Sequence, residues 1–187
     1  MGDLEAVRTT LLQGANVIAI DSTGATALVA AAYGGHVEIA RLLIERGADV
    51  NTQDNSKQSA FLIATSEGPL ELLRLTLASG ADVTRLDSFN GTGLIRAAKR
   101  GHADIVAELL KTAIAIDHIN RLGWTALLEA IILGTGGERH TETVRLLVSA
   151  GANVNLGDRN GVRPLAHAKQ RGFSAITAIL EGAGARE

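Results

Sequence analysis

Residues 21–51 read DSTGATALVAAAYGGHVEIARLLIERGADVN, and this stretch contains the plan on which the rest of the chain is built. Its order predicts a turn, a short inner helix, a Gly-His turn, a longer outer helix and an exit that ends at glycine. The plan returns every 33 residues: Leu28 is followed at that interval by Phe61, Leu94 and Leu127. A period of this length indicates a repeat protein, in which each unit packs on its neighbours, and not one closed core.

The residues at the ends of the predicted helices recur in the same phase. Thr26 stands directly before the first inner helix, where its hydroxyl can accept a hydrogen bond from an otherwise unpaired backbone N–H. The same position in later units is taken by Ser59, Thr92 and Thr125. The outer helices are predicted to end where a left-handed backbone is least costly, at Gly47, Gly80 and Gly151.

Three motifs of the stretch resemble the ankyrin repeat: Thr26-Ala-Leu28, Gly35-His36-Val-Glu38-Ile39 and Gly47-Ala-Asp-Val-Asn51. They recur in phase over nearly the whole chain, so the resemblance is specific. It implies a mostly α fold, an ankyrin-repeat α-solenoid with β-hairpin fingers, in about five repeats plus an N-terminal half-repeat. The close similarity between units also resembles bacterial or consensus-like ankyrin proteins.

We expect a single ankyrin-repeat domain over residues 1–187. Its units are expected at about residues 1–20 (the half-repeat), 21–53, 54–86, 87–119, 120–157 and 158–187 (a C-terminal cap). The half-repeat begins at its outer helix, because Leu4-Glu5-Ala-Val7 aligns with Val37-Glu38-Ile-Ala40. Two explanations of it stay open: a natural polar cap, or a chain shortened from a longer precursor, for example one with a leader peptide.

The fifth unit contains a length change. Asp104 and Glu142 hold equivalent positions but are 38 residues apart, so five residues are inserted between the helices, within residues 133–142. The inserted sequence Gly134-Thr-Gly136-Gly137 invites comparison with a phosphate-binding loop, but no Gly-Lys-Ser/Thr follows it and no strand is predicted before it. A helix connector is the favoured interpretation, and Arg139 and His140 beside it form a second candidate site for an acidic ligand.

Composition disfavours several functional classes. The net charge is −2 and the pI is near 6.2, which disfavours nucleic acid as a partner. No apolar run reaches the length of about 18 residues that membrane insertion requires. Cysteine is absent, so the chain has neither disulfides nor a thiolate nucleophile. We expect a soluble monomer, and the compartment stays open between the cytoplasm and, if a leader before Met1 was removed, the periplasm.

The sequence predicts no catalytic, cofactor or metal site. The histidines at 36, 102, 118, 140 and 167 lack a partner at metal-ligand spacing. The serines and threonines that recur do so at helix caps, without a base beside them. We therefore expect a protein that is not an enzyme.

The resemblance implies that a partner is recognised in a concave groove of hairpin tips and inner helices, by the positions that do not repeat. Aromatic and arginine side chains dominate binding hot spots. The candidate partner-binding residues are Tyr33, Phe89, Lys99, Arg100, Arg121, Leu122, Trp124, Ile132 and Leu133. A competing explanation is that Phe89 and Trp124 fold back on the adjacent hairpin.

The favoured function is therefore a non-catalytic scaffold that binds a partner protein or peptide. Two alternatives remain: a ligand or anion sensor that uses the Gly-rich 134–140 loop, and an accessory protein to an enzyme.

Overall fold

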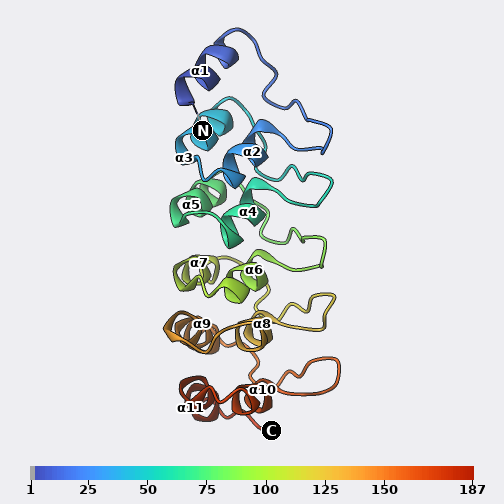
Figure 1. The fold of residues 1–187 in the computed structure, drawn as a ribbon, viewed down its shortest axis with the longest axis vertical. Helices are drawn as coiled ribbons and strands as arrows, with labels where there is room; N and C mark the ends of the chain where they lie inside the picture. Colours follow the sequence, from blue (N-terminus) through green and yellow to red (C-terminus); the bar gives the residue numbers. More distant parts are fainter. Residues whose placement is uncertain (1–2) are drawn as a thin grey trace. The chain divides into compact units, whose positions relative to one another are not determined.

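A computed structural model describes residues 3–187 of the chain and shows eleven α-helices (Figure 1). Within the described residues, β pairing is limited to one isolated bridge between Ile20 and Thr26. The chain forms two compact units, Met1–Ser88 and Phe89–Glu187. The expectation of a mostly α fold is confirmed.

The first unit contains α1 (Leu4–Leu12), α2 (Ala27–Tyr33), α3 (Val37–Glu45), α4 (Ala60–Ser66) and α5 (Leu70–Ala78). The inner helices α2 and α4 pack on each other, and each also packs on its own outer helix, α3 or α5. The outer helix α3 lies between α1 and α5. The largest core side chains of this unit include Leu28, Leu43, Phe61, Leu62, Ile63, Leu72 and Leu73.

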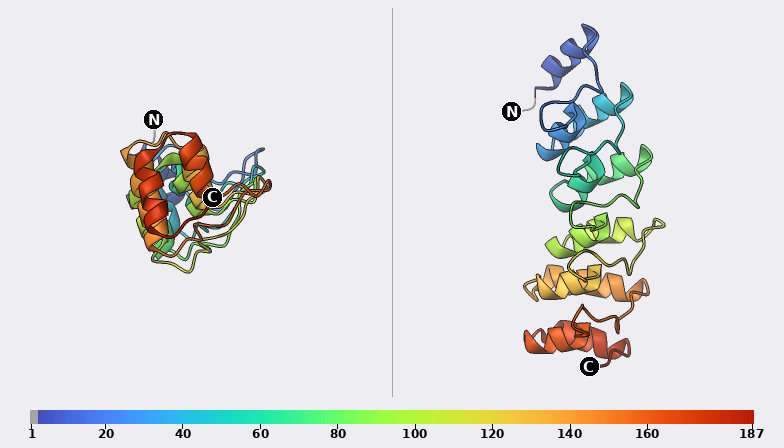
Figure 2. Two further views of the ribbon diagram at one scale, coloured as in Figure 1. Left: turned by 90° about the horizontal axis from the view of Figure 1, so that it is seen from below. Right: turned by 90° about the vertical axis from the view of Figure 1, so that its right-hand side faces the viewer.

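The second unit contains α6 (Gly93–Arg100), α7 (Ala103–Leu109), α8 (Ala126–Ile132), α9 (Glu138–Ser149), α10 (Pro164–Gln170) and α11 (Ser174–Gly182). The inner helices α6, α8 and α10 pack in one row, and the outer helices α7, α9 and α11 pack in a second. The connecting loops of this unit extend from the inner row, on the side away from the outer row (Figures 1 and 2). These loops, and the equivalent hairpin turns of the first unit, are called fingers below.

The predicted caps begin four of the inner helices. The hydroxyl of Thr26 accepts from the backbone N–H of Val29 at 3.2 Å, and Ser59, Thr92 and Thr125 make the same bond at 3.3–3.4 Å. These hydroxyls are buried, so each bond satisfies a donor that water does not reach. The inner helix of the last repeat starts differently, with Pro164 in its first turn.

Four hairpin turns close with a backbone hydrogen bond across the turn, and they begin at Asp21, Asp54, Asn120 and Asp158. Among the described residues, none of these turns continues as a ladder of strands. In the third predicted unit, the N–H of Asp54 donates to Gln58 O at 2.9 Å, and the Asp54 carboxylate accepts from the N–H groups of Ser56 and Gln58. One residue of the turn is left-handed, usually a glycine such as Gly123, with φ +85°. Lys57 and Asn90 adopt φ 59° and 60° at this position, which costs a side-chain-bearing residue some backbone strain.

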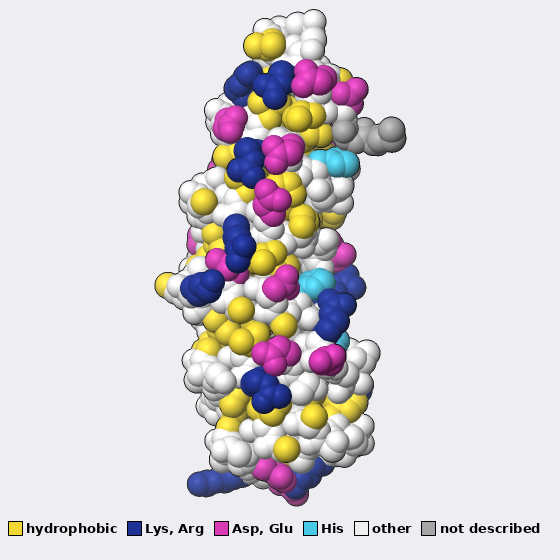
Figure 3. Space-filling view, turned by 90° about the vertical axis from the view of Figure 1, so that its left-hand side faces the viewer, with side chains coloured by type: hydrophobic (Ala, Val, Ile, Leu, Met, Phe, Trp, Pro, Cys, Tyr) yellow, Lys and Arg dark blue, Asp and Glu magenta, His cyan; other side chains and the backbone are white. Residues whose placement is uncertain are grey.

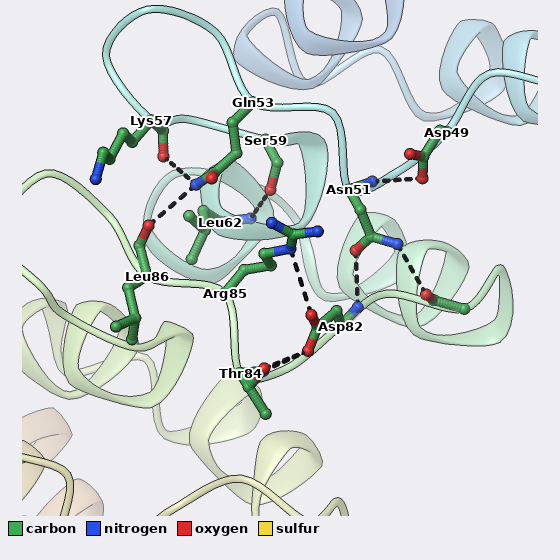
Figure 4. Close-up of polar contacts among 11 residues, drawn as sticks. Asp49, Asn51, Gln53, Lys57, Ser59, Leu62, Asp82, Thr84, Arg85 and Leu86 are labelled. Atoms are coloured by element: carbon green, nitrogen blue, oxygen red, sulfur yellow. Dashed lines mark hydrogen bonds and ion pairs between the residues drawn. The ribbon is translucent and has the colours of Figure 1, made fainter.

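Asparagine and aspartate side chains connect the exits of neighbouring repeats (Figure 4). The Oδ1 of Asn51 accepts from Asp82 N at 2.7 Å, and its Nδ2 donates to Gly80 O at 3.1 Å. Asn155 makes the same two bonds, to Arg186 N and Gly184 O. Asp117 accepts from Asn153 N, which lies 36 residues later in the chain. In the two contacts in which Asn51 and Asn155 are the acceptors, the donor N–H lies 31 residues after the acceptor. The difference of five residues agrees with the predicted insertion.

The insertion lengthens both the loop and the helix that follows it. The connector between α8 and α9 covers residues 133–137, whereas residues 101–102 suffice between α6 and α7. Helix α9 has 12 residues, and the other outer helices have seven to nine. The inserted residues therefore add to helix α9 as well as to the loop.

Candidate functional site

Eight of the nine candidate partner-binding residues belong to the second unit, where they form two groups. The finger group lies on the hairpin turns and comprises Phe89, Arg121, Leu122 and Trp124. The helix-end group lies where α6 and α8 end and comprises Lys99, Arg100, Ile132 and Leu133. Tyr33, the last residue of α2, is on the first unit and is 55% exposed.

The finger group combines exposed apolar and basic side chains. Phe89 is 60% exposed and Leu122 is 43% exposed, although both are large apolar residues. The side chain of Arg121 is exposed as well, whereas Trp124 is half-buried at the base of its turn. Apolar surface of this kind is unfavourable in water unless a partner covers it.

Hydrogen bonds between neighbouring turns hold the finger group in place. The N–H of Arg121 donates to Phe89 O at 2.8 Å, and the Nε2 of His118 lies 2.7 Å from Asn90 O. The guanidinium of Arg159, from the next turn, donates to Arg121 O. Since a surface that is already ordered loses less entropy on binding, this arrangement favours recognition without rearrangement.

Beneath the fingers lies a buried polar contact that sequence reasoning missed. Glu129 of α8 is 3% exposed, and its Oε1 accepts from the Nδ2 of Asn120 at 2.7 Å. The Oδ1 of Asn120 accepts from the N–H groups of Leu122 and Trp124. Asn120 thereby connects the inner helix to the turn that carries the finger group.

In the next repeat the inner helix is also connected to its hairpin turn, but by a histidine and an aspartate. The Nε2 of His167 in α10 lies 3.0 Å from the Oδ2 of Asp158, and Asp158 also accepts from the N–H groups of Asn160 and Val162. Burial raises the pKa of the Asp158 carboxyl, but the hydrogen bonds from Val162, Asn160 and His167 outweigh it and hold this pKa below its usual value. The sequence signal that could have revealed both contacts is a polar residue nine positions after the Asn or Asp that begins the turn.

The second candidate site, Arg139 and His140, is engaged with the backbone of the preceding repeat. His140 is buried, and its Nε2 lies 3.2 Å from Lys99 O. Arg139 donates to Gly101 O at 3.3 Å and lies 3.0 Å from the Nδ1 of His102. These contacts satisfy carbonyl groups at the end of α6, which have no partner within their own helix.

The same kind of contact follows one repeat later. Arg171 donates to Gly134 O at 2.9 Å, while its guanidinium lies 4.8 Å from the centre of the Phe173 ring. A Cβ on Gly136 would collide with that ring. The Gly-rich sequence is therefore packed against its neighbours, which agrees with its interpretation as a helix connector.

On the face drawn in Figure 3, the described Lys and Arg side chains are interspersed with Asp and Glu, and hydrophobic side chains lie between them. In the first unit, Arg41 pairs with Glu71 at 3.0 Å and with Glu38 at 3.6 Å. In the second unit, Arg145 pairs with Glu142 at 3.1 Å. Exposed pairs of this kind contribute little to stability.

Residues 3–187 bring together no group of three or more histidine, aspartate or glutamate side chains placed to hold a metal ion. In the same part of the chain, no helix combines the length and the apolar character needed to cross a bilayer. The candidate surface is thus one of apolar and basic side chains on hydrogen-bonded turns.

Comparison with known proteins gives consistent results. The family model for ankyrin repeats in three copies matches residues 1–87, 61–158 and 94–186. YahD, an ankyrin repeat protein of Escherichia coli strain K12, is 47% identical over 62 residues, which are 33% of this chain and 31% of YahD. The match thus spans about a third of that relative.

Two solved structures resemble the chain over almost its full length. An ankyrin repeat domain from Acinetobacter baumannii AYE, ABAYE2397, is 45% identical with a TM-score of 0.93, and the match covers 98% of this chain and 94% of that one. The ankyrin repeat protein EF0377 is 32% identical with a TM-score of 0.86, and the match covers 97% and 98%. The predicted ankyrin-repeat α-solenoid is confirmed. Ankyrin repeats generally serve as protein–protein interaction modules. The chain belongs to the ankyrin repeat family.

Proposed function

We propose that this chain is a non-catalytic scaffold that binds a partner protein or peptide through the finger group and the helix-end group of the second unit. The observation that supports this most directly is the exposure of Phe89 and Leu122 on turns that are hydrogen-bonded to one another. Exposed apolar area on an ordered backbone is the arrangement in which a few residues supply most of a binding free energy.

The exposed cations give the proposed partner a chemical character. Lys99 and Arg100 lie at the end of α6, and Arg121 lies at a finger tip. A partner segment that places apolar side chains against the fingers and carboxylates near these cations would be complementary to both groups. Such charges act mainly on the rate of association and on partner choice, while the apolar contacts supply affinity.

The contacts of Arg139 and His140 favour the scaffold over an anion sensor. Both side chains already interact with the backbone of residues 99–101. An anion at this position would compete with contacts that hold two repeats together. We therefore propose a structural role for this pair.

The test is capture of partners from the native host by the wild type and by a variant with Arg100→Ala, Arg121→Ala and Trp124→Ala. A captured partner should lose about 2 kcal/mol of binding free energy, roughly 30-fold in Kd, from Trp124→Ala alone. The control is Arg41→Ala with Arg145→Ala, which removes two outer-helix cations. Equal affinity of the wild type and the triple variant, with both folded by circular dichroism, would refute the proposed surface.

A further inference from the structure

Neighbouring fingers interlock through the fourth residue of one turn and the second residue of the next. In the first unit these residues are Gly24 and Asn55, and a Cβ on Gly24 would lie only 2.7 Å from the Oδ1 of Asn55. The backbones of the two turns are also joined, because the N–H of Asn55 donates to Thr23 O at 2.9 Å. Glycine at the fourth position therefore leaves room for a side chain of the next finger.

The last two fingers of the second unit show the same arrangement with an arginine. A Cβ on Gly123 would collide with the Cγ of Arg159, the second residue of the following turn. The Arg159 side chain thus crosses the preceding turn, and its guanidinium donates to Arg121 O. This contact fixes the positive end of Arg159 on the finger.

Arg121 is the second residue of its own turn, but the turn before it has Asn90 at the fourth position. The N–H of Arg121 donates to Phe89 O at 2.8 Å, which is the register that joins Asn55 to Thr23. In that register the side chain would lie where Asn90 already has a Cβ, and close-packed atoms cannot share this space. Arg121 is exposed, and among residues 3–187 no hydrogen bond or ion pair engages its guanidinium.

We propose that Asn90 determines the specificity of the finger group, because its side chain keeps Arg121 off the preceding turn and leaves the guanidinium available to a carboxylate of the partner. The planar guanidinium can donate two parallel hydrogen bonds to a carboxylate. Phe89 on the joined finger and Leu122 next in the chain are exposed apolar residues. The occupant is therefore a polypeptide segment with an acidic side chain between apolar ones.

This inference rests on the proposed function, since it assigns a chemical class to the partner of the finger group. It also separates the two finger arginines. Arg121 binds the partner, whereas Arg159 holds the finger in place. Asn90 itself needs no contact with the partner, so it acts as a positioning residue.

The role of Asn90 is tested without any partner, by NMR measurement of hydrogen exchange at the arginine guanidinium groups. In the wild type, exchange at Arg159 should be slower than at Arg121, because Arg159 is hydrogen-bonded to the finger. Asn90→Gly should slow the exchange at Arg121 toward that of Arg159. The variant should fold, since glycine adopts the φ of 60° at this position without strain, and His118 bonds only to the backbone oxygen of residue 90.

The matched control is Lys57→Gly in the first unit. Lys57 has φ 59° at the same turn position, so this substitution relieves the same backbone strain. The second residue of the next turn is Ser88, which has no guanidinium. Exchange at Arg121 should therefore be the same in Lys57→Gly as in the wild type.

The partner chemistry is tested with the peptide Leu-Glu-Phe, blocked at both ends, and its Leu-Gln-Phe counterpart, by following the Arg121 guanidinium signals during titration. The glutamate peptide should bind the wild type more tightly than the glutamine peptide. Asn90→Gly should weaken its binding about two- to fivefold, the range expected for one exposed ion pair. Lys57→Gly should bind it like the wild type.

Three results would overturn the proposal: equal exchange at Arg121 in the wild type and Asn90→Gly, equal affinity for the two peptides, and binding of a single-stranded DNA oligonucleotide without binding of the glutamate peptide. Failure of the proposed function looks different. In that case the exchange and peptide results hold, but the triple variant captures its partner as the wild type does.

Discussion

The two units use different chemistry at the same inner-helix position, nine residues after the first residue of the hairpin turn. In the first unit this position holds Ala30 and Ile63, and in the second it holds Arg96, Glu129 and His167. Ile63 is fully buried among apolar residues, whereas Glu129 is buried with the Asn120 amide as donor. One backbone plan thus accommodates either packing or a specific hydrogen bond beneath the finger.

The difference matters for function because the candidate surface lies on the hydrogen-bonded unit. Asn120 connects Glu129 to the backbone of Leu122 and Trp124. A bond with directional geometry restricts the turn more than apolar contact does, since apolar contacts are not directional. We infer that the polar position orients the finger group.

The largest effect on stability is expected when the apolar inner-helix position of the first unit is given the polar residue found in the second unit. Ile63→Glu should cost at least about 4 kcal/mol of unfolding free energy, because it buries a carboxylate opposite the Asp54 turn without a donor. Adding Asp54→Asn should recover about 1.5–3 kcal/mol by recreating the Asn120–Glu129 contact. Urea titrations of the single and double variants measure both values. A double variant no more stable than Ile63→Glu would show that the two units are not interchangeable.

In the second unit, Asn120→Asp should cost about 2–4 kcal/mol, because a carboxylate replaces the amide that donates to buried Glu129 at 2.7 Å. The turn itself should survive, since aspartate keeps the oxygen that accepts from Leu122 and Trp124. The control is Asp54→Asn in the first unit, where the position nine residues later is the apolar Ile63, and it should change the unfolding free energy by less than about 1 kcal/mol. A similar loss of unfolding free energy for the two substitutions would contradict the proposed difference in chemistry between the two units.

The contacts between repeat exits should have a smaller effect. Asn51→Ala removes two hydrogen bonds to the next repeat and should cost about 1–2 kcal/mol. Thr84 holds the equivalent position one repeat later, where its hydroxyl bonds to Asp82 two residues away. Thr84→Ala should therefore cost less than Asn51→Ala, by denaturant unfolding. The reverse order would show that these side chains do not join the repeats.

The smallest expected effect is a pH dependence of the second unit. The folded state holds the pKa of Asp158 below its ordinary value, so the unfolded state takes up a proton at higher pH than the folded state does. The stabilisation is fully present above the unfolded pKa, near 4, and is lost as the pH falls through the lower folded value. Wild-type thermal midpoints should therefore fall more than those of Asp158→Asn between about pH 5 and pH 3. If the thermal midpoints of the wild type and Asp158→Asn fell in parallel with pH, Asp158 would not contribute to the pH dependence of stability.

Much of the fold could be predicted because the repeat signals are local and periodic. The caps at Thr26, Ser59, Thr92 and Thr125 each need only one residue before an apolar helix, and all four are present. The inserted length followed from the alignment of Asp104 with Glu142. How the insertion divides between loop and helix depends on contacts of Arg139 and His140 with another repeat, which no local pattern reveals.

The candidate site could be predicted only in part. Non-repeating aromatic and basic residues pointed to the fingers, and the structure shows Phe89 and Leu122 exposed there. The connection from Asn120 to Glu129 was missed, because a spacing of nine residues belongs to neither helix nor strand periodicity. The partition of the candidates between two units was likewise invisible, since it depends on tertiary packing. The participation of these residues in binding stays a prediction.

The central claim is that a partner polypeptide binds the second unit through its fingers and inner-helix ends. The most direct measurement is amide hydrogen exchange of the chain with and without a captured partner. We expect new protection in residues 118–124 and at the ends of α6 and α8, with the exchange of the outer helices unchanged. Protection confined to the outer helices, or to α1 and α2 alone, would contradict it.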